Sequence, residues 1–127
     1  MSKPVFDDIF AFSGRRNRKS YLLWFVAVSV ITLVVWGLAL VLSASRDEWT
    51  MTVIAGLLSI PVAISSWAVE AQRCRDFGWT GWAVLLTLIP YVGWIFALAI
   101  IFIPGNVGPN RYGPDPLGAA TNPWQQR

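Results

Sequence analysis

Histidine is absent from the 127-residue sequence, and cysteine occurs once, as Cys74. A single cysteine excludes an internal disulfide, and a chain without histidine has few ligands for structural zinc or a transition metal. Charge is also scarce, since 13% of the residues are charged, compared with about 25% in soluble domains. Hydrophobic residues make up 55% of the chain. This composition predicts a membrane protein that uses no metal and no cofactor.

Three long stretches contain no Asp, Glu, Lys or Arg: residues 21–42, 51–69 and 82–103. Each is close to the length of about 20 residues that an α-helix needs to cross a hydrocarbon core of ~30 Å. None shows the alternation of polar and apolar residues typical of a membrane β-strand. We therefore expect an all-α integral membrane protein with three transmembrane helices, forming a single membrane domain over residues 1–127. A soluble bundle of three buried helices is the alternative.

The third stretch contains a break that the first lacks. Pro90 and Gly93 divide it into two shorter halves. Proline removes a backbone donor and kinks a helix, which membrane helices tolerate when neighbours satisfy the freed carbonyl. The sequence favours a kinked transmembrane helix here, and a re-entrant hairpin that turns at 90–93 remains the alternative.

Both ends of the chain differ in composition from these stretches. Residues 1–20 carry five basic and two acidic side chains, and the apolar residues Phe6, Ile9 and Phe10 predict a short interfacial helix. Residues 104–127 are rich in Pro, Gly and Asn, which is typical of turns. The tail is expected to be either an ordered surface loop or disordered.

The basic residues predict an orientation. Seven of ten lie before the first stretch or between the second and third: Lys3, Arg15, Arg16, Arg18, Lys19, Arg73 and Arg75. The positive-inside rule places these regions, and the N-terminus, in the cytoplasm. With three spans, the C-terminal tail would lie on the opposite side.

The connection at residues 72–82 reads QRCRDFGWTGW and concentrates charge between two uncharged stretches. Arg73 lies three residues from both Glu70 and Asp76, so a helix that continues to Asp76 would place all three on one face as a charge-assisted network. Glycines at 78 and 81 permit a sharp return, and Trp82 suits the membrane interface. The pattern predicts a hinge held by ion pairs.

Three segments in order resemble one known family. They are Gly14-Arg15-Arg16-Asn17-Arg18-Lys19-Ser20-Tyr21, Arg73-Cys74-Arg75-Asp76-Phe77-Gly78-Trp79-Thr80-Gly81-Trp82 and Asn110-Arg111-Tyr112-Gly113-Pro114-Asp115-Pro116. Together they resemble the small inner-membrane proteins grouped as domain of unknown function 805. Ser20 stands where that family often has an acid, and Arg75 where many members have histidine.

The resemblance implies a multi-pass protein of the bacterial inner membrane and a fold, but no biochemical role. It also marks the candidate structural or binding residues, to which Glu70 is added from the charge pattern. These are Gly14, Arg15, Arg18, Glu70, Arg73, Asp76, Gly78, Gly81, Trp82, Asn110, Arg111, Tyr112, Gly113, Asp115 and Pro116.

An enzymatic role is the least supported class. No histidine and no phosphate, flavin or nucleotide motif is present. Cys74 lies beside two arginines that would favour a thiolate, but no base accompanies it. Nucleic-acid binding is also disfavoured, because no basic stripe follows a soluble domain.

Two functional classes remain. The preferred one is a non-enzymatic accessory protein of the envelope that binds a membrane-protein partner, a second copy of itself, or the anionic phospholipids of the bilayer through its basic N-terminal segment. The alternative is a subunit of an oligomeric transporter or channel. In that reading Glu70, at the edge of the second stretch, is the candidate for an ion or proton path.

Overall fold

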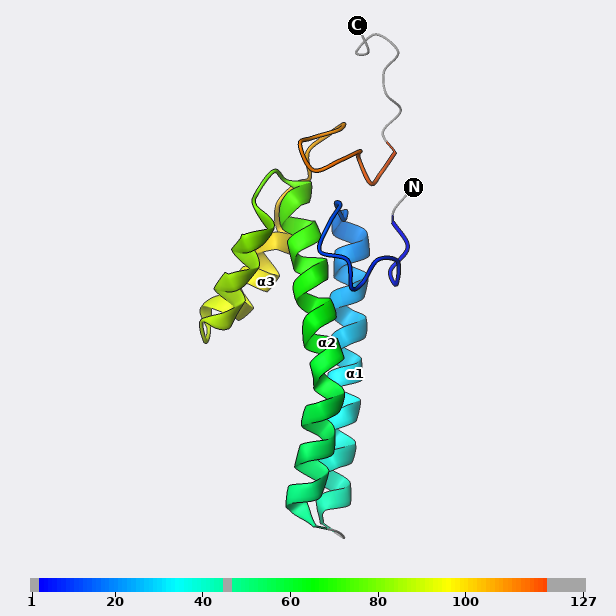
Figure 1. Cartoon of the computed structure of the whole chain (residues 1–127), viewed down its shortest axis with the longest axis vertical. Coiled ribbons are helices and arrows are strands. Elements are labelled where there is room, and N and C mark those ends of the chain that lie inside the picture. The colour runs from blue at the N-terminus through cyan, green and yellow to red at the C-terminus, as the bar shows by residue number, and fades with distance from the viewer. Residues whose placement is uncertain (1–2, 45–46, 119–127) are drawn as a thin grey trace, which may run out of the picture.

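The computed structural model describes residues 3–44 and 47–118, and its regular elements are helices. They are α1 (Arg18–Ser43), α2 (Glu48–Asp76), the 3-10 helix η1 (Gly81–Leu88) and α3 (Val92–Phe102). Helices α1 and α2 run side by side as a long hairpin, and η1 and α3 pack beside one end of it (Figure 1). The predicted all-α class is confirmed.

Helices α1 and α2 have the length and composition of membrane spans. They contain 26 and 29 residues, which is about 39 and 44 Å of helix at ~1.5 Å per residue. The large apolar side chains along them are exposed rather than packed inside, as at Leu33, Leu40 and Leu57. A soluble bundle would bury these side chains, so the exposed apolar surface favours a lipid environment.

The third uncharged stretch does not form one kinked helix, which the sequence favoured. It forms η1 and α3, which are joined by a turn over residues 89–91 where Tyr91 has a φ of +64°. Both ends of this unit lie at the C-terminal end of α2. Gly81 lies against the side chain of Arg75, and the N–H of Asn106 donates to the carbonyl of Asp76 at 2.7 Å.

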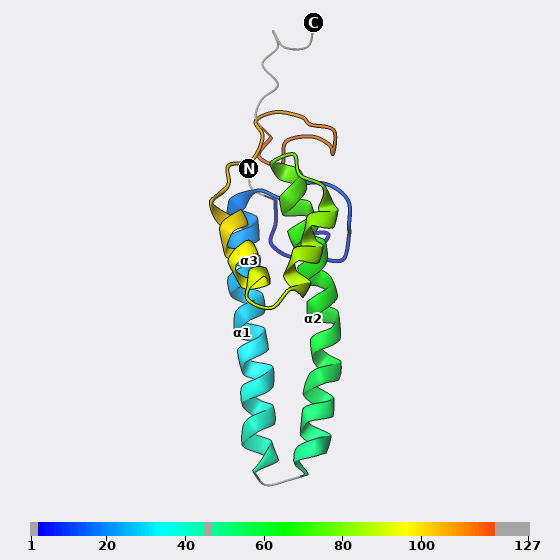
Figure 2. The ribbon, with the colours of Figure 1, turned by 90° about the vertical axis from the view of Figure 1, so that its left-hand side faces the viewer.

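The segment therefore forms a helical hairpin, which is the shape of the alternative prediction. In Figure 2, η1 descends beside α2 and α3 returns beside α1. Pro90 cannot donate a helical hydrogen bond, which explains the position of the break. Gly93 lets the two helices approach closely, since a Cβ there would lie 2.6 Å from the carbonyl oxygen of Thr87.

The N-terminal segment also differs from its prediction. Residues 5–10 form turns rather than an interfacial helix, with Asp8 at a φ of +51°. Side chains from elsewhere take the carbonyls that a helix would use internally. Arg16 donates to the carbonyls of Pro4 and Val5, and Gln72 donates to that of Asp8.

Residues 104–118 of the C-terminal tail lie at the same end of the molecule as the N-terminal segment, not at the opposite end (Figure 1). Residues 104–118 form an ordered set of turns with a bridge between Asn110 and Gly113. The remainder of the predicted tail, 119–127, lies outside the described residues. The reversal within the third stretch explains this placement, because η1 runs away from the C-terminal end of α2 and α3 runs back toward it.

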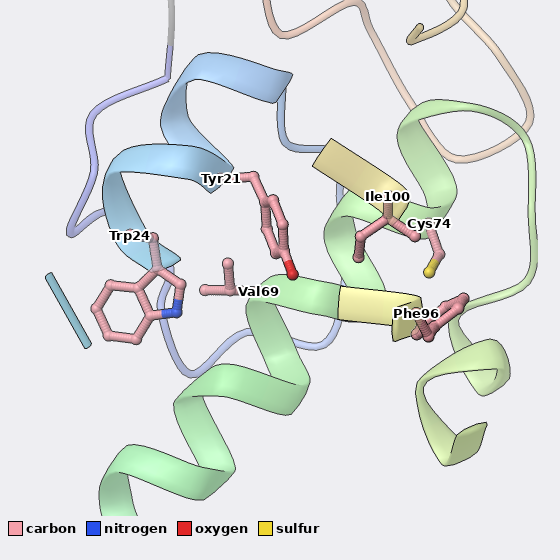
Figure 3. Packing of buried hydrophobic residues seen from close by; sticks show 6 residues of the cluster. All are labelled: Tyr21, Trp24, Val69, Cys74, Phe96 and Ile100. Carbon is pink, nitrogen blue, oxygen red and sulfur yellow. The ribbon is translucent and has the colours of Figure 1, made fainter. Parts of the chain in front are cut away.

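The apolar core lies where α1, α2 and α3 meet (Figure 3). Its buried members are Tyr21, Trp24, Val69, Cys74, Phe96 and Ile100. The hydroxyl of Tyr21 donates to the carbonyl of Ala97 at 3.1 Å and so links α1 to α3. This core joins the hairpin of η1 and α3 to the N-terminal part of α1 and the C-terminal part of α2.

Candidate functional site

We use the term polar cap for residues 3–17, the last turn of α2 (residues 72–76) and residues 104–118, which pack together where α1 begins and α2 ends. Asp76 lies at its centre between two arginines. Arg73 Nη1 lies 2.5 Å from Asp76 Oδ2, and Arg15 Nη2 lies 3.1 Å from Asp76 Oδ1. The three side chains are at most 4% exposed. The predicted Arg73–Asp76 pair is therefore present, but it is part of a triad that includes Arg15.

The remaining donors of Arg15 hold the C-terminal loops. Its Nη1 donates to the carbonyl of Gly108 at 2.6 Å and to that of Gly113 at 3.3 Å, and its Nη2 donates to that of Asn106 at 2.6 Å. A guanidinium has five donors in a rigid fork, so one side chain can bind a carboxylate and several carbonyls together. Arg15 thus connects the first and third of the family-like segments through the second.

Arg73 performs a similar task for the hairpin. Its Nε donates to the carbonyl of Ile100 at 3.0 Å, and its Nη2 donates to that of Ile103. These carbonyls belong to the C-terminal end of α3, where the last helical carbonyls lack partners within the helix. The buried guanidinium of Arg73 therefore stabilises the contact between the C-terminal end of α3 and the polar cap.

Sequence reasoning did not select a third buried arginine, Arg16. Its side chain is fully buried, and its donors reach Gln72 Oε1 at 3.1 Å, Ser20 Oγ at 2.7 Å and the carbonyl of Asp7. Burial lowers the pKa of this guanidinium, and the nearby carboxylates of Asp8 and Asp7 oppose the shift. The sequence held a signal for Gln72, the partner of Arg16, because Gln72 lies four residues before Asp76 and hence on the same helical face.

Glu70 does not join the network that the sequence predicted. Arg73 directs its donors toward Asp76 and the end of α3, and no ion pair forms between Arg73 and Glu70 in the part of the chain that is described. Glu70 is 9% exposed, and its Oε2 has no hydrogen-bond partner. It lines the apolar groove between α1 and α2 rather than the polar cap.

The glycines of the connection have the predicted role in the turn. Gly78 follows α2 with a φ of +87°, a conformation that favours glycine. Gly81 lies beneath the guanidinium of Arg75, where a Cβ would be 2.5 Å from Nη2. Trp82 is 74% exposed, which fits a side chain that contacts lipid at the interface.

The closing segment packs onto this turn. Asn110 Nδ2 donates to the carbonyl of Arg75 at 2.9 Å, and the guanidinium of Arg75 lies 5.8 Å from the ring centre of Tyr112. The guanidinium of Arg111 lies 4.7 Å from the centre of the same ring and donates to the carbonyl of Gly78. Asp115 accepts from the N–H of Gly108 at 2.9 Å.

Three candidate residues have mainly conformational roles. Gly14 and Gly113 have φ values of +82° and +131°, which allow the chain to turn into and within the polar cap. Pro116 is partly buried and follows Asp115 in the last described turn. The structure thus brings nearly all the candidate residues together in or next to the polar cap. Glu70 lies apart from them in the groove, and Arg18 lies at the edge of the cap.

Arg18 instead borders a hollow at the edge of the polar cap. The cavity has a volume of about 400 Å³, and its lining includes Asn17, Lys19, Asn106 and Asp115. Arg18 and Lys19 are exposed, and neither pairs with a carboxylate among the described residues. The two cations are therefore available to an external anion.

The fold and the polar cap define a small all-helical membrane protein in which residues 3–17 and 104–118 pack together over one end of a helical hairpin. The chain belongs to the family described as "Protein of unknown function (DUF805)", whose model matches residues 9–114. The family resemblance seen in the sequence is confirmed.

Two relatives from Escherichia coli strain K12 are similar over most of their length. The inner membrane protein YhaH is 34% identical over 114 residues, which cover 88% of this chain and 92% of YhaH. The inner membrane protein YhaI is 28% identical over 112 residues, which cover 88% of this chain and 91% of YhaI. No solved structure matches the chain.

Proposed function

We propose that this protein is a non-enzymatic protein of the bacterial inner membrane that binds anionic phospholipid headgroups at its polar cap. Helices α1 and α2 would cross the bilayer, and η1 with α3 would enter it from the cytoplasmic side without crossing. The lengths and exposed apolar surfaces of α1 and α2 support the two spans. The names of the two relatives support the inner membrane as the location.

The distribution of basic residues supports a cytoplasmic position for the polar cap. Seven of the ten lie in the N-terminal segment or at the end of α2, and Arg111 lies in the tail at the same end. The positive-inside rule therefore supports a cytoplasmic position for residues 3–17 and 104–118. The expected cytoplasmic position of the N-terminus is kept. Because two spans replace three, residues 104–118 are proposed to lie on the cytoplasmic side as well.

A structural rather than catalytic role for the triad is supported by how fully its groups are used. Asp76 receives two guanidinium groups, and the other donors of Arg15 and Arg73 reach backbone carbonyls. Catalytic acids and nucleophiles need access to a substrate. Cys74 is fully buried in the apolar core, which argues against a reactive thiol.

The observation that carries headgroup binding is the pair of unpaired cations beside the hollow. Arg18 and Lys19 occupy the first turn of α1, where the Asn17 side chain makes no capping hydrogen bond. The amides of a first helical turn attract anions, and two adjacent cations add to this attraction. The carboxylates that also line the hollow are already bound, Asp76 by arginines and Asp115 by backbone amides.

Native mass spectrometry of the purified, delipidated protein tests this proposal. Phosphatidylglycerol should be retained in preference to phosphatidylcholine. The double variant Arg18→Gln with Lys19→Gln should bind phosphatidylglycerol about 30-fold more weakly, because each cation near an anionic lipid contributes roughly 1 kcal/mol. Arg111→Gln removes an exposed cation at the same end and serves as the matched control. Equal retention by the double variant and the control would exclude this headgroup site.

A further inference from the structure

Two buried polar atoms have no hydrogen-bond partner among the described residues, Glu70 Oε2 and Trp24 Nε1. They differ in chemistry, since a carboxylate only accepts hydrogen bonds and an indole N–H only donates them. Their side chains are 9% and 5% exposed. Leaving such groups buried without partners is costly, so a ligand that satisfies both would be favoured.

Both atoms belong to residues that line one groove. The groove has a volume of about 560 Å³ and lies between α1 and α2, with Trp94 of α3 at its side. It extends along α1 from Tyr21 to Trp36, which is about 22 Å at ~1.5 Å per residue. Apart from its serines, threonine and Glu70, the lining is apolar, so the groove has a charged end and a long apolar remainder.

Among the described residues, several candidate donors to Glu70 are already used. The hydroxyl of Tyr21 already donates to the carbonyl of Ala97, and the guanidinium of Arg73 is occupied at the polar cap. The hydroxyls of Ser29 and Ser66 donate to carbonyls of their own helices. A ligand from outside the chain could therefore supply the partner for this carboxylate.

Within the three uncharged stretches, a second copy of the chain carries no cation that could face Glu70. Glu70 directly follows the uncharged stretch 51–69, and neither this stretch nor 21–42 or 82–103 contains Lys or Arg. With α2 crossing the bilayer as proposed above, Glu70 lies near the boundary at which headgroups meet acyl chains. An amphiphile with a cationic headgroup matches it in both charge and shape.

We propose that this groove binds a phospholipid whose headgroup ends in a primary ammonium, such as phosphatidylethanolamine. The ammonium donates to the Glu70 carboxylate, the Trp24 N–H donates to a phosphate or ester oxygen of the same lipid, and one acyl chain lies along the groove toward Trp36. Figure 3 shows the Trp24 ring beside α1 with its nitrogen on the side of Val69, one residue before Glu70 on α2. This site is separate from the anionic headgroup site at Arg18 and Lys19 and does not depend on it.

A headgroup-methylation series on the unaltered, delipidated protein is the primary test. Phosphatidylethanolamine, its monomethyl and dimethyl derivatives and phosphatidylcholine share one phosphate and one chain composition, while the number of ammonium donors falls to zero. Retention in native mass spectrometry should fall along the series, with about tenfold weaker binding of phosphatidylcholine, as expected for the loss of a charge-assisted hydrogen bond. Equal binding across the series would overturn the proposal.

Variants then assign the contacts. Glu70→Gln should remove the preference for phosphatidylethanolamine over phosphatidylcholine, whereas Glu48→Gln, which alters an exposed acid on the same helix, should retain it. Trp24→Phe should weaken both lipids, because it removes the donor to their shared oxygens. Ala63→Phe obstructs the apolar part of the groove from an exposed position and should weaken both with Glu70 intact.

Other outcomes have defined meanings. A preference that survives in Glu70→Gln would overturn the assignment of the ammonium to this carboxylate. Proton flux into liposomes that disappears in Glu70→Gln while phosphatidylethanolamine binding is unchanged would overturn it in favour of a transport path. Binding of phosphatidylglycerol should be unaffected by Glu70→Gln, so failure here is distinguishable from failure of the anionic site at the polar cap.

Discussion

Asp76 Oδ2 lies 2.5 Å from Arg73 Nη1, one helical turn before it on α2, and the other oxygen of the same carboxylate is bound by Arg15 from the N-terminal segment. Asp76 is therefore the single carboxylate between two buried guanidinium groups. Its removal leaves both positive charges without compensation, which is more costly than the loss of one exposed pair.

We expect Asp76→Ala to lower the free energy of unfolding by about 3–5 kcal/mol, the range for breaking a buried ion pair. The measurement is thermal or denaturant unfolding of the purified protein in mild detergent. Glu48→Ala, at an exposed acid of α2, is the control and should be nearly neutral. The charge swap Arg73→Asp with Asp76→Arg should fail to rescue stability, because Arg15 would then face a guanidinium. Full rescue would show that Arg15 contributes nothing to the triad.

Arg15 should determine whether residues 104–118 stay packed on the polar cap. Arg15→Lys keeps the charge but loses the planar fork that binds Asp76 and the carbonyls of Asn106 and Gly108 together. We expect hydrogen exchange of the backbone amides in 106–113 to become at least about tenfold faster, while exchange in the middle of α2 is unchanged. Unaltered exchange in 106–113 would contradict the role of Arg15 in holding residues 104–118 on the polar cap.

Gly93 should be intolerant of a side chain. A Cβ at this position would lie 2.6 Å from the carbonyl oxygen of Thr87, whereas one at Gly56 meets nothing within 4 Å. Gly93→Ala should therefore destabilise the protein by about 1–3 kcal/mol through overpacking. Gly56→Ala should be neutral or stabilise α2 by up to about 1 kcal/mol through helix propensity. Equal effects of the two substitutions in thermal unfolding would argue against close packing of η1 on α3.

Cysteine labelling in intact cells should report both chain ends on one side of the membrane. Cys74 is fully buried, so the unaltered protein should react slowly and provide the background. Lys19→Cys and Arg111→Cys should both resist a membrane-impermeant maleimide until the membrane is opened, and Glu48→Cys should react in intact cells. Labelling of Arg111→Cys but not Lys19→Cys would restore a third span.

Several features were predictable because they depend on local chemistry. Uncharged stretches of membrane length predicted α1 and α2. The donor missing from Pro90 predicted the break in the third stretch. The spacing of Arg73 and Asp76 predicted their pairing once α2 was assumed to reach Asp76, and α2 does end there. The family-like segments were recognised as sequence before their contacts were known.

The direction of the chain after Pro90 was not predictable in the same way. A kink and a reversal need the same residues, and the choice depends on whether α3 finds partners beside α1 and α2. Tyr21 and Arg73 provide them by binding the carbonyls of Ala97 and Ile100. For this reason residues 104–118 lie at the end of the molecule where α1 begins.

The sequence by itself determined the class of the protein, its two long apolar helices, the position of the break and its family, because composition and local spacing are properties of short segments. Only the tertiary structure decided which charges are buried and which remain free. The contacts of Arg15 with Asp76 and Gly108 join residues 61 and 93 positions apart. Such contacts depend on how the helices pack, and the same packing leaves Glu70 facing an apolar groove rather than Arg73.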